Sequence, residues 1–264
     1  MPFNIDQPTP SPWKKLFPVA RVIGEKAFHL VLPPRCLACD RLVSEHGGLC
    51  VSCWRDLAFI EYPVCDCTGA PLAYDLGGKI VSADALANPP DYTRLRAALR
   101  YEGAAQRLIT AFKYQDRLDL TKPLARFTMR AARELLTETD VIVPVPLHRA
   151  RFFKRRFNQA AELAKVIARA SDKPTALNAL MRIRNTPQQV SLDPMERARN
   201  VQGAFRVKPE HRIKIAGRAV LLVDDVVTTG ATVNACARAL LREGACRVDV
   251  AAVAKVVNNG DGAI

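Results

Sequence analysis

The segment spanning residues 220–232 constrains the fold of this chain more than any other. It opens with an unbroken apolar run, residues 220–223, which is typical of a strand buried on both faces of a parallel sheet. An acidic pair, Asp224 and Asp225, follows the run, and a hydroxyl-rich loop with a single glycine comes next. The residues after the loop are apolar at helical spacing up to Gly244, so the segment predicts a strand, a loop and a helix in succession.

The chemistry of this segment suits a sugar phosphate. Backbone N–H groups at the start of a helix point outward and carry the positive end of the helix dipole, so the loop over residues 228–232 can hold a phosphate. Gly230 lets the backbone approach a ligand closely, and paired carboxylates accept hydrogen bonds from vicinal hydroxyls or help to hold Mg²⁺. The alternative is an ordinary strand–turn–helix whose aspartates cap the helix, but the combination of Asp-Asp with Thr-Thr-Gly-x-Thr argues against it.

The segment closely resembles the phosphoribosyl-pyrophosphate (PRPP) motif of type I phosphoribosyltransferases. The resemblance implies that Asp224 and Asp225 are the catalytic pair and meet the ribose hydroxyls of PRPP, which is bound with Mg²⁺. It also implies that the loop holds the 5-phosphate. The loop residues implied in this contact are Thr228, Thr229, Gly230, Ala231 and Thr232.

The N-terminal part of the chain contains two C-x₂-C pairs, Cys36 with Cys39 and Cys50 with Cys53. Each pair places two thiolates on one side of a tight turn, and two such turns close a tetrahedral shell around Zn²⁺. Because the protein then fills all the ligand positions, the spacing predicts a structural zinc rather than a catalytic one.

Two further cysteines, Cys65 and Cys67, follow in a C-x-C arrangement. Three interpretations stay open: ligands in place of one C-x₂-C pair, free thiols, or a redox pair. Free thiols are favoured because a full set of ligands already exists. A redox pair is disfavoured because C-x-C is a strained spacing for a disulfide.

Length and composition set wider limits. The 264 residues can build one sizeable α/β domain with a small appendage. The net charge of +13 favours a polyanionic partner, although the arginine content of a GC-rich genome explains it equally well. Charges at Arg21, Glu25 and Lys26 interrupt the apolar N-terminal residues, so we expect no secretion signal and no membrane span. In a cytoplasmic protein, eight cysteines argue for metal ligands and free thiols rather than disulfides.

The remaining sequence predicts alternating strands and helices. Residues 93–101 alternate apolar side chains with Arg94, Arg96 and Arg100, which predicts a strand with a basic face. Residues 68–91 are rich in Gly, Pro, Ala and Asp and predict an irregular connector. Further helices are expected over residues 104–114, 120–137 and 158–170, and further strands over 140–145 and 247–253.

The strand over residues 140–145 runs into a proline-rich turn, which ends it at the carboxyl edge of the sheet, where open α/β sheets bind ligands. A basic loop follows, and its position before a helix favours polyphosphate binding over a solvated charge run; a nucleic-acid backbone is its other suitable partner. The long polar segment over residues 183–207 is typical of a mobile functional loop or a linker, and Arg197 and Asn200 within it are expected to fold toward a substrate. The residues expected to contact PRPP from these segments are Pro144, Val145, Arg149, Arg155, Arg156 and Arg197.

Taken in order, these motifs resemble those of the ComF/GntX family of competence-associated, phosphoribosyltransferase-like proteins. The similarity covers residues 30–255 and includes both cysteine pairs, residues 144–149 and 155–160, residues 188–205, and the PRPP motif. It implies a type I phosphoribosyltransferase fold behind an N-terminal zinc module, a role in DNA uptake or processing during natural transformation, and a cytoplasmic location. Family members often carry a third C-x₂-C followed by Gly, and the chain departs from that pattern over residues 65–69.

We therefore expect three parts: a disordered arm over residues 1–12, a helix and a zinc module similar to a double zinc ribbon over 13–70, and an α/β domain with a parallel sheet flanked by helices over 92–257. Two functions stay open. One is a phosphoribosyltransferase with an unassigned acceptor, and the other is a non-catalytic protein that binds single-stranded DNA or senses PRPP, in contact with the competence machinery. The aromatic content of 6% offers few stacking platforms for DNA, and the basic-aromatic cluster of Phe152, Phe153 and Phe157 is more typical of core.

Overall fold

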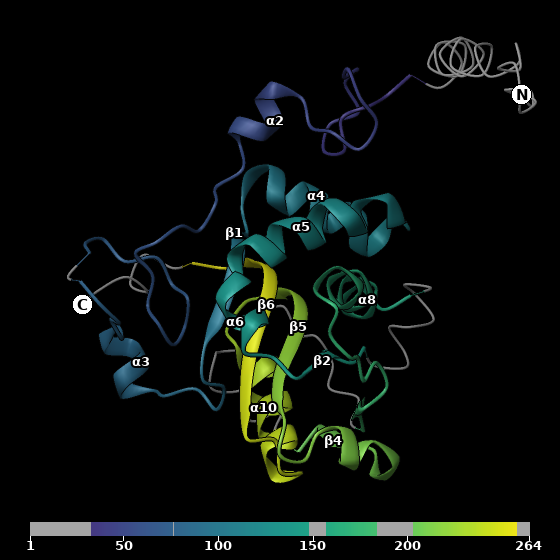
Figure 1. Cartoon of the computed structure of the whole chain (residues 1–264). Helices are drawn as coiled ribbons and strands as arrows, with labels where there is room; N and C mark the ends of the chain where they lie inside the picture. The colour runs from purple at the N-terminus through teal and green to yellow at the C-terminus, as the bar shows by residue number, and fades with distance from the viewer. Residues whose placement is uncertain (1–32, 76, 148–156, 184–202, 258–264) are drawn as a thin grey trace, which may run out of the picture. The chain divides into compact units, whose positions relative to one another are not determined.

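A computed structural model describes residues 33–75, 77–147, 157–183 and 203–257 of the chain (Figure 1). The chain divides into two compact units, Met1–Cys50 and Val51–Ile264, and the second carries the main sheet. The arm and the helix expected before Pro33 lie outside the described residues. The domain boundaries expected from the sequence stay a prediction.

A four-stranded parallel sheet forms the centre of the second unit. Its strands are β1 (Leu95–Arg100), β2 (Val141–Pro144), β5 (Ala219–Val227) and β6 (Arg247–Lys255), and Figure 1 shows them in the order β1-β6-β5-β2. Every residue of β2 and nearly every residue of β5 and β6 is buried, because helices cover both faces of the sheet. This double coverage explains the unbroken apolar run with which β5 opens.

Three helices build the two faces. On one face, α5 (Thr121–Ala131) and α8 (Gln159–Ser171) pack against each other and against the sheet. On the other, α10 (Ala231–Arg242) packs Val233 and Cys236 against the even-numbered residues of β5. The structure therefore confirms the expected parallel sheet flanked by helices.

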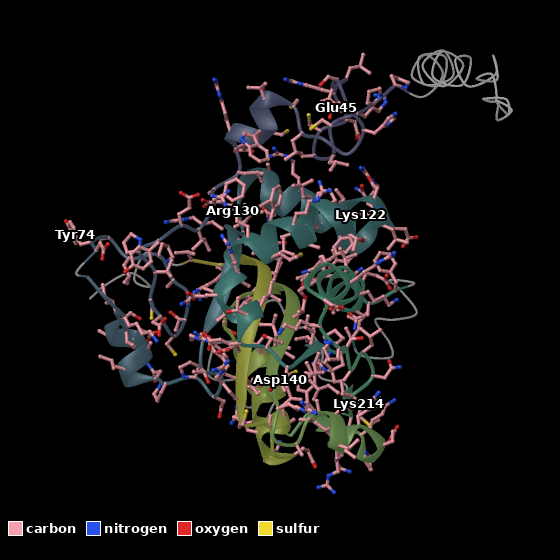
Figure 2. All side chains as sticks on the ribbon, in the orientation of Figure 1. Glu45, Tyr74, Lys122, Arg130, Asp140 and Lys214 are labelled. Atoms are coloured by element: carbon pink, nitrogen blue, oxygen red, sulfur yellow. The ribbon has the colours of Figure 1, made fainter. Side chains whose placement is uncertain are left out.

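One acidic residue, Asp140, fixes the amino ends of β2 and β5 relative to each other. Asp140, labelled in Figure 2, precedes β2, and its backbone N–H donates to the carbonyl of Ala219 (2.9 Å). Its Oδ2 accepts a hydrogen bond from the N–H of Ala219 (2.8 Å). This two-way contact sets the register in which β2 and β5 run toward their carboxyl ends.

Two elements differ from the sequence prediction. The helix expected over residues 120–137 is two helices that meet at Ala132, and the turn there allows both leucines of the second to be buried. The connector expected over 68–91 contains a helix of its own.

None of the described helices is both long and apolar enough to cross a membrane. The remaining elements are α2 (Val51–Arg55), α3 (Ala83–Ala87), α4 (Gly103–Tyr114), η2 (Leu118–Leu120), α6 (Arg133–Thr137), the antiparallel pair β3 (Leu180–Arg182) and β4 (Phe205–Val207), and η3 (Pro209–Lys214).

The basic face expected on the first strand is wrong for two of its arginines. The guanidinium of Arg94 donates to both carboxylate oxygens of Asp249 (3.3 and 3.0 Å) and of Glu138 (3.2 and 2.9 Å). Arg96 is paired with Asp66 (2.9 Å) and Glu134 (2.7 Å). The hydrogen bond with Asp249, ahead of that with Glu138, raises the pKa of Arg94, so this cation belongs to the fold rather than to a nucleic-acid surface.

We predict that Arg94→Ala lowers the free energy of unfolding by about 2–4 kcal/mol, measured by urea denaturation, because it leaves the buried Asp249 carboxylate without its bidentate partner. Arg169→Ala, which removes an exposed arginine of α8, is the matched control and should change stability by less than about 0.5 kcal/mol. Equal effects of the two substitutions would contradict the structural role of Arg94.

Candidate functional site

The carboxyl ends of β2 and β5 part from each other. The two strands pair from Val141 with Val220 to Pro144 with Val223, and the last hydrogen bond joins the N–H of Val145 to the carbonyl of Val223 (2.9 Å). Beyond this point β5 continues with β6 as its remaining partner. The last residues of β5 therefore lie beyond the point where its pairing with β2 ends.

The chain leaves β2 and β5 in opposite directions. After β2, α8 leads outward to Thr175, which forms a parallel bridge with Ile142 on the outer side of β2. After β5, α10 leads to β6 on the other side. In open α/β sheets, ligands bind where successive connections diverge in this way. The divergence brings the predicted residues Pro144 and Val145 to the same edge as the acidic pair.

Asp224 and Asp225 lie within β5 rather than after it, and their side chains point to opposite faces. Asp225 is buried and forms an ion pair with Lys113 of α4, with Nζ and Oδ1 3.0 Å apart. Asp224 accepts a hydrogen bond at Oδ1 from the N–H of Asp225 (2.8 Å). Burial, and next the charge of Asp224, raise the pKa of Cys236 in α10, which places Asp224 on the α10 side.

The loop after β5 ends at Gly230, the N-cap of α10, with φ 76° and ψ −7°. This left-handed conformation favours glycine. The first hydrogen bond of the helix runs from the N–H of Asn234 to the carbonyl of Gly230 (2.9 Å), so the earlier N–H groups point out of the helix. A Cβ added at Gly230 would meet nothing closer than Asn234 Nδ2 and Tyr92 Oη, both 3.9 Å away. With Thr228 and Thr229 exposed beside it, the loop leaves open space at a helix N-terminus.

Two residues at the start of α8 anchor α4 and the loop after β2. Gln159, which is 1% exposed, donates from Nε2 to the carbonyl of Phe112 (3.3 Å) and so anchors the end of α4 that carries Lys113. Asn158 caps α8, accepting at Oδ1 from the N–H two residues later (3.1 Å). Its Nδ2 donates to the carbonyl of Val145 (3.1 Å), which ties the loop after β2 to the helix.

Three side chains at this site carry no mark in the sequence. Lys113 and Tyr92 reach it through tertiary packing, whereas Asn234 lies one helical turn after Gly230 in α10 and accepts a hydrogen bond at Oδ1 from the N–H of Asp91 (2.8 Å). A lysine near the end of an amphipathic helix is ordinary, and its partner lies in a different part of the chain. The predicted contacts Arg149, Arg155, Arg156 and Arg197 lie outside the described residues, so their role stays a prediction.

Two cavities can be compared with this geometry. One of about 620 Å³ lies beside the loop after β2 and is lined by Pro146, Asn158 and Arg182, among others. Another of about 680 Å³ lies against β1 and α6, away from every residue of the PRPP motif.

The four predicted zinc ligands come together as expected. The Sγ atoms of Cys36, Cys39, Cys50 and Cys53 all lie within 4.8 Å of one another. Burial opposes ionisation of the Cys36 thiol, but hydrogen bonds from Cys50 and neighbouring groups outweigh it and lower its pKa to about 6. Thiolates at these distances fit a tetrahedral structural Zn²⁺.

Comparisons with known proteins agree with the zinc module and with the α/β domain. The family model described as double zinc ribbon domain matches residues 27–85, and that described as phosphoribosyl transferase domain matches residues 115–262. DNA utilization protein YhgH of Escherichia coli (strain K12) is 31% identical over 227 residues, covering 84% of this chain and 96% of that protein. The chain belongs to the ComF family.

Two further relatives of this ComF-family chain carry competence in their names. Competence protein F of Haemophilus influenzae is 29% identical over 227 residues, covering 84% of this chain and 96% of that protein. Competence protein ComFC of Bacillus subtilis (strain 168) is 27% identical over 237 residues, covering 79% of this chain and 89% of that protein. The resemblance read from the motifs is thus confirmed.

We predict that Cys36→Ser combined with Cys39→Ser removes the zinc of the first cysteine cluster, because two of its four ligands are lost and binding is coupled to folding of such modules. Elemental analysis of the purified chain measures the change. Cys246→Ser, at an exposed thiol outside the cluster, is the control and should leave the zinc content unchanged. Full zinc retention in the double variant would reject this ligand set.

Proposed function

We propose that this ComF-family chain binds PRPP with Mg²⁺ at the carboxyl ends of β2 and β5. The observation that carries the proposal is the open N-terminus of α10, capped by Gly230 in a left-handed conformation directly after an acid-bearing strand. A helix N-terminus with exposed hydroxyls suits a phosphate, and carboxylates at the adjacent strand end suit ribose hydroxyls.

The described residues of the site have separate roles in this proposal. The 5-phosphate accepts hydrogen bonds from the first-turn N–H groups of α10 and from the hydroxyls of Thr228 and Thr229. Asp224 accepts from a ribose hydroxyl, while Lys113 holds Asp225 in place. Carboxylate oxygens are also the ligands that Mg²⁺ prefers, and the bound ion would offset the charge of the pyrophosphate group.

If the chain is a transferase, the bond between C1 of the ribose and the pyrophosphate oxygen breaks and a bond from C1 to the acceptor forms. The developing positive charge at C1 is stabilised by nearby carboxylates, and no covalent nucleophile from the protein is needed. A chain that only senses PRPP would bind it without this exchange. Pyrophosphate release from labelled PRPP, with bases, nucleotides and single-stranded DNA as acceptors, distinguishes the two.

We further propose a cytoplasmic role in DNA uptake and use, supported by the names of the relatives. One surface favours a single-stranded nucleic acid as partner. Trp54, which is 51% exposed, lies beside Phe59 and Phe127, with ring centroids 5.8 and 6.1 Å from its own. The guanidinium of Arg130 lies 5.5 Å from the centroid of the Phe59 ring (Figure 2 labels Arg130). Aromatic rings beside a cation are the groups on which unpaired bases stack.

This cluster joins residues that are separated in the sequence. The three phenylalanines of the basic-aromatic cluster, in contrast, lie close together in the chain and were expected to be core. Of those, Phe157 packs against Phe112 with ring centroids 5.9 Å apart, as expected for a core position. Phe152 and Phe153 lie outside the described residues. The cluster around Trp54 is therefore the better candidate for base stacking.

We predict that Asp224→Asn combined with Asp225→Asn weakens PRPP binding at least about 100-fold in calorimetry, because Asp224 no longer offers a charged acceptor to the ribose and Asp225 no longer forms its ion pair with Lys113, without a change of shape. Asp172→Asn is the matched control. It makes the same change at an exposed left-handed position that Asn tolerates, and it should leave the affinity unaltered. Unchanged PRPP affinity in the double variant would refute the assignment.

For DNA, we predict that Trp54→Ala lowers the affinity for single-stranded DNA roughly 5- to 100-fold, the amount expected from loss of a stacked base. Fluorescence anisotropy with a labelled oligonucleotide measures it. Tyr74→Ala removes another exposed aromatic residue outside the cluster and should have little effect. The same loss in both variants, or an affinity that does not fall with added salt, would count against this surface.

A further inference from the structure

The turn around Cys65 repeats the backbone of the first zinc-binding turn. In residues 35–42 and again in residues 64–71, the N–H of the leading cysteine donates to the carbonyl five residues later, at 2.7 Å for Cys36 and 2.8 Å for Cys65. The carbonyl of each cysteine accepts from the N–H four residues later (3.0 and 2.8 Å). That fourth residue has a positive φ in both turns, 59° and 63°, and an antiparallel bridge closes each.

The second half of the ribbon is repeated as well. Cys50 directly precedes the five-residue helix α2, and Ser82 directly precedes the five-residue helix α3. The N–H of Cys50 donates to Cys36 Sγ at 3.3 Å, and the N–H of Ser82 donates to Cys65 Sγ at the same distance. The next hydrogen bond is repeated too. The N–H of Leu37 donates to the carbonyl of Gly48 (3.1 Å), and the N–H of Asp66 donates to the carbonyl of Ile80 (2.7 Å).

The repeat sets the two copies in register. The positions of Cys36, Cys39, Cys50 and Cys53 in the first correspond to Cys65, Thr68, Ser82 and Ala85 in the second. One thiol is thus retained where a zinc site needs several ligands, and Cys67 stands one residue before a ligand position. We infer that residues 64–88 are a second ribbon that keeps its fold without a metal, so that this double ribbon holds a single zinc.

Other contacts replace the metal. Cys65 is fully buried, and its Sγ accepts from the N–H and the hydroxyl of Ser82 (3.3 and 3.5 Å) and from the N–H of Thr68 (3.5 Å). Burial opposes ionisation of this thiol, but these hydrogen bonds outweigh it and lower its pKa. Around it, Ala70, Leu72 and Ala85 form a small apolar core in place of the remaining thiolates.

This second ribbon covers the open edge of β1. The N–H of Leu95 donates to the carbonyl of Cys67 (2.8 Å), and Arg96 donates to the carbonyl and the carboxylate of Asp66 (2.8 and 2.9 Å). A Cβ added at Gly69 would lie 2.3 Å from the carbonyl oxygen of Leu95, so the turn lies directly on the strand backbone. An edge strand with unpaired backbone groups is a liability, and the turn satisfies part of that edge.

Zinc content tests the inference directly and independently of PRPP binding. The full chain, dialysed against a chelator of moderate affinity, is expected to hold about one zinc per chain. Cys65→Ala is expected to keep that zinc and to lower the melting temperature by roughly 2–8 °C, since buried donors lose their acceptor. About two zinc ions per natural chain, or loss of zinc in Cys65→Ala, would overturn the inference.

Restoring the missing ligands gives a second test. Thr68→Cys, Ser82→Cys and Ala85→Cys together complete a four-cysteine site with Cys65, and the folded variant is expected to hold about two zinc ions. Adding Cys67→Ser should leave the second ion bound, whereas adding Cys65→Ala should weaken it. A folded triple variant with about one zinc would refute the register. If that variant does not fold, the zinc content of the natural chain and of Cys65→Ala still tests whether the second ribbon lacks a metal.

Discussion

The candidate site depends on the unequal pairing of β5 with its two neighbours. Pairing with β2 ends at Val223, whereas pairing with β6 continues to Val227. The acidic pair is therefore held in a regular strand by β6 and lies beyond the end of its pairing with β2. The connections from β2 and β5 also run in opposite directions, an arrangement at which open α/β sheets bind ligands, and α10 begins directly after the loop that follows β5. Backbone hydrogen bonding thus places carboxylates and helix N–H groups at one edge.

The N-terminal ribbons illustrate two ways of holding the same turn. In the first, four thiols converge to within 4.8 Å, which suits a metal. In the second, one buried thiol accepts hydrogen bonds from Ser82 and Thr68, and small apolar residues fill the remaining space. The second copy also pairs with β1, so the sheet supports it. A ribbon attached to a larger core has less need of a metal than a ribbon that folds alone.

Local pattern was enough to predict the parallel sheet, most helix boundaries, the strand, loop and helix that begin at residue 220, and the first cysteine cluster, because each of these depends on residues within a short segment. Long-range pairs were not predictable in this way. Lys113 meets Asp225, and Arg94 meets Asp249, only once the sheet has formed. The register of the second ribbon was not predictable for another reason. Thr68, Ser82 and Ala85 stand at three of its four ligand positions, so the cysteine spacing that marks the first ribbon is absent, although the backbone hydrogen bonds match.

The central claim is that the loop between β5 and α10 holds a ribose 5-phosphate group. Amide chemical shifts of the isotopically labelled full chain, titrated with ribose 5-phosphate, test it most directly. Binding at this loop predicts that the largest shifts are those of the Gly230, Ala231 and Thr232 amides, whose N–H groups lie at the start of the helix. Saturable shifts elsewhere in the chain, with these three amides unmoved, would contradict it.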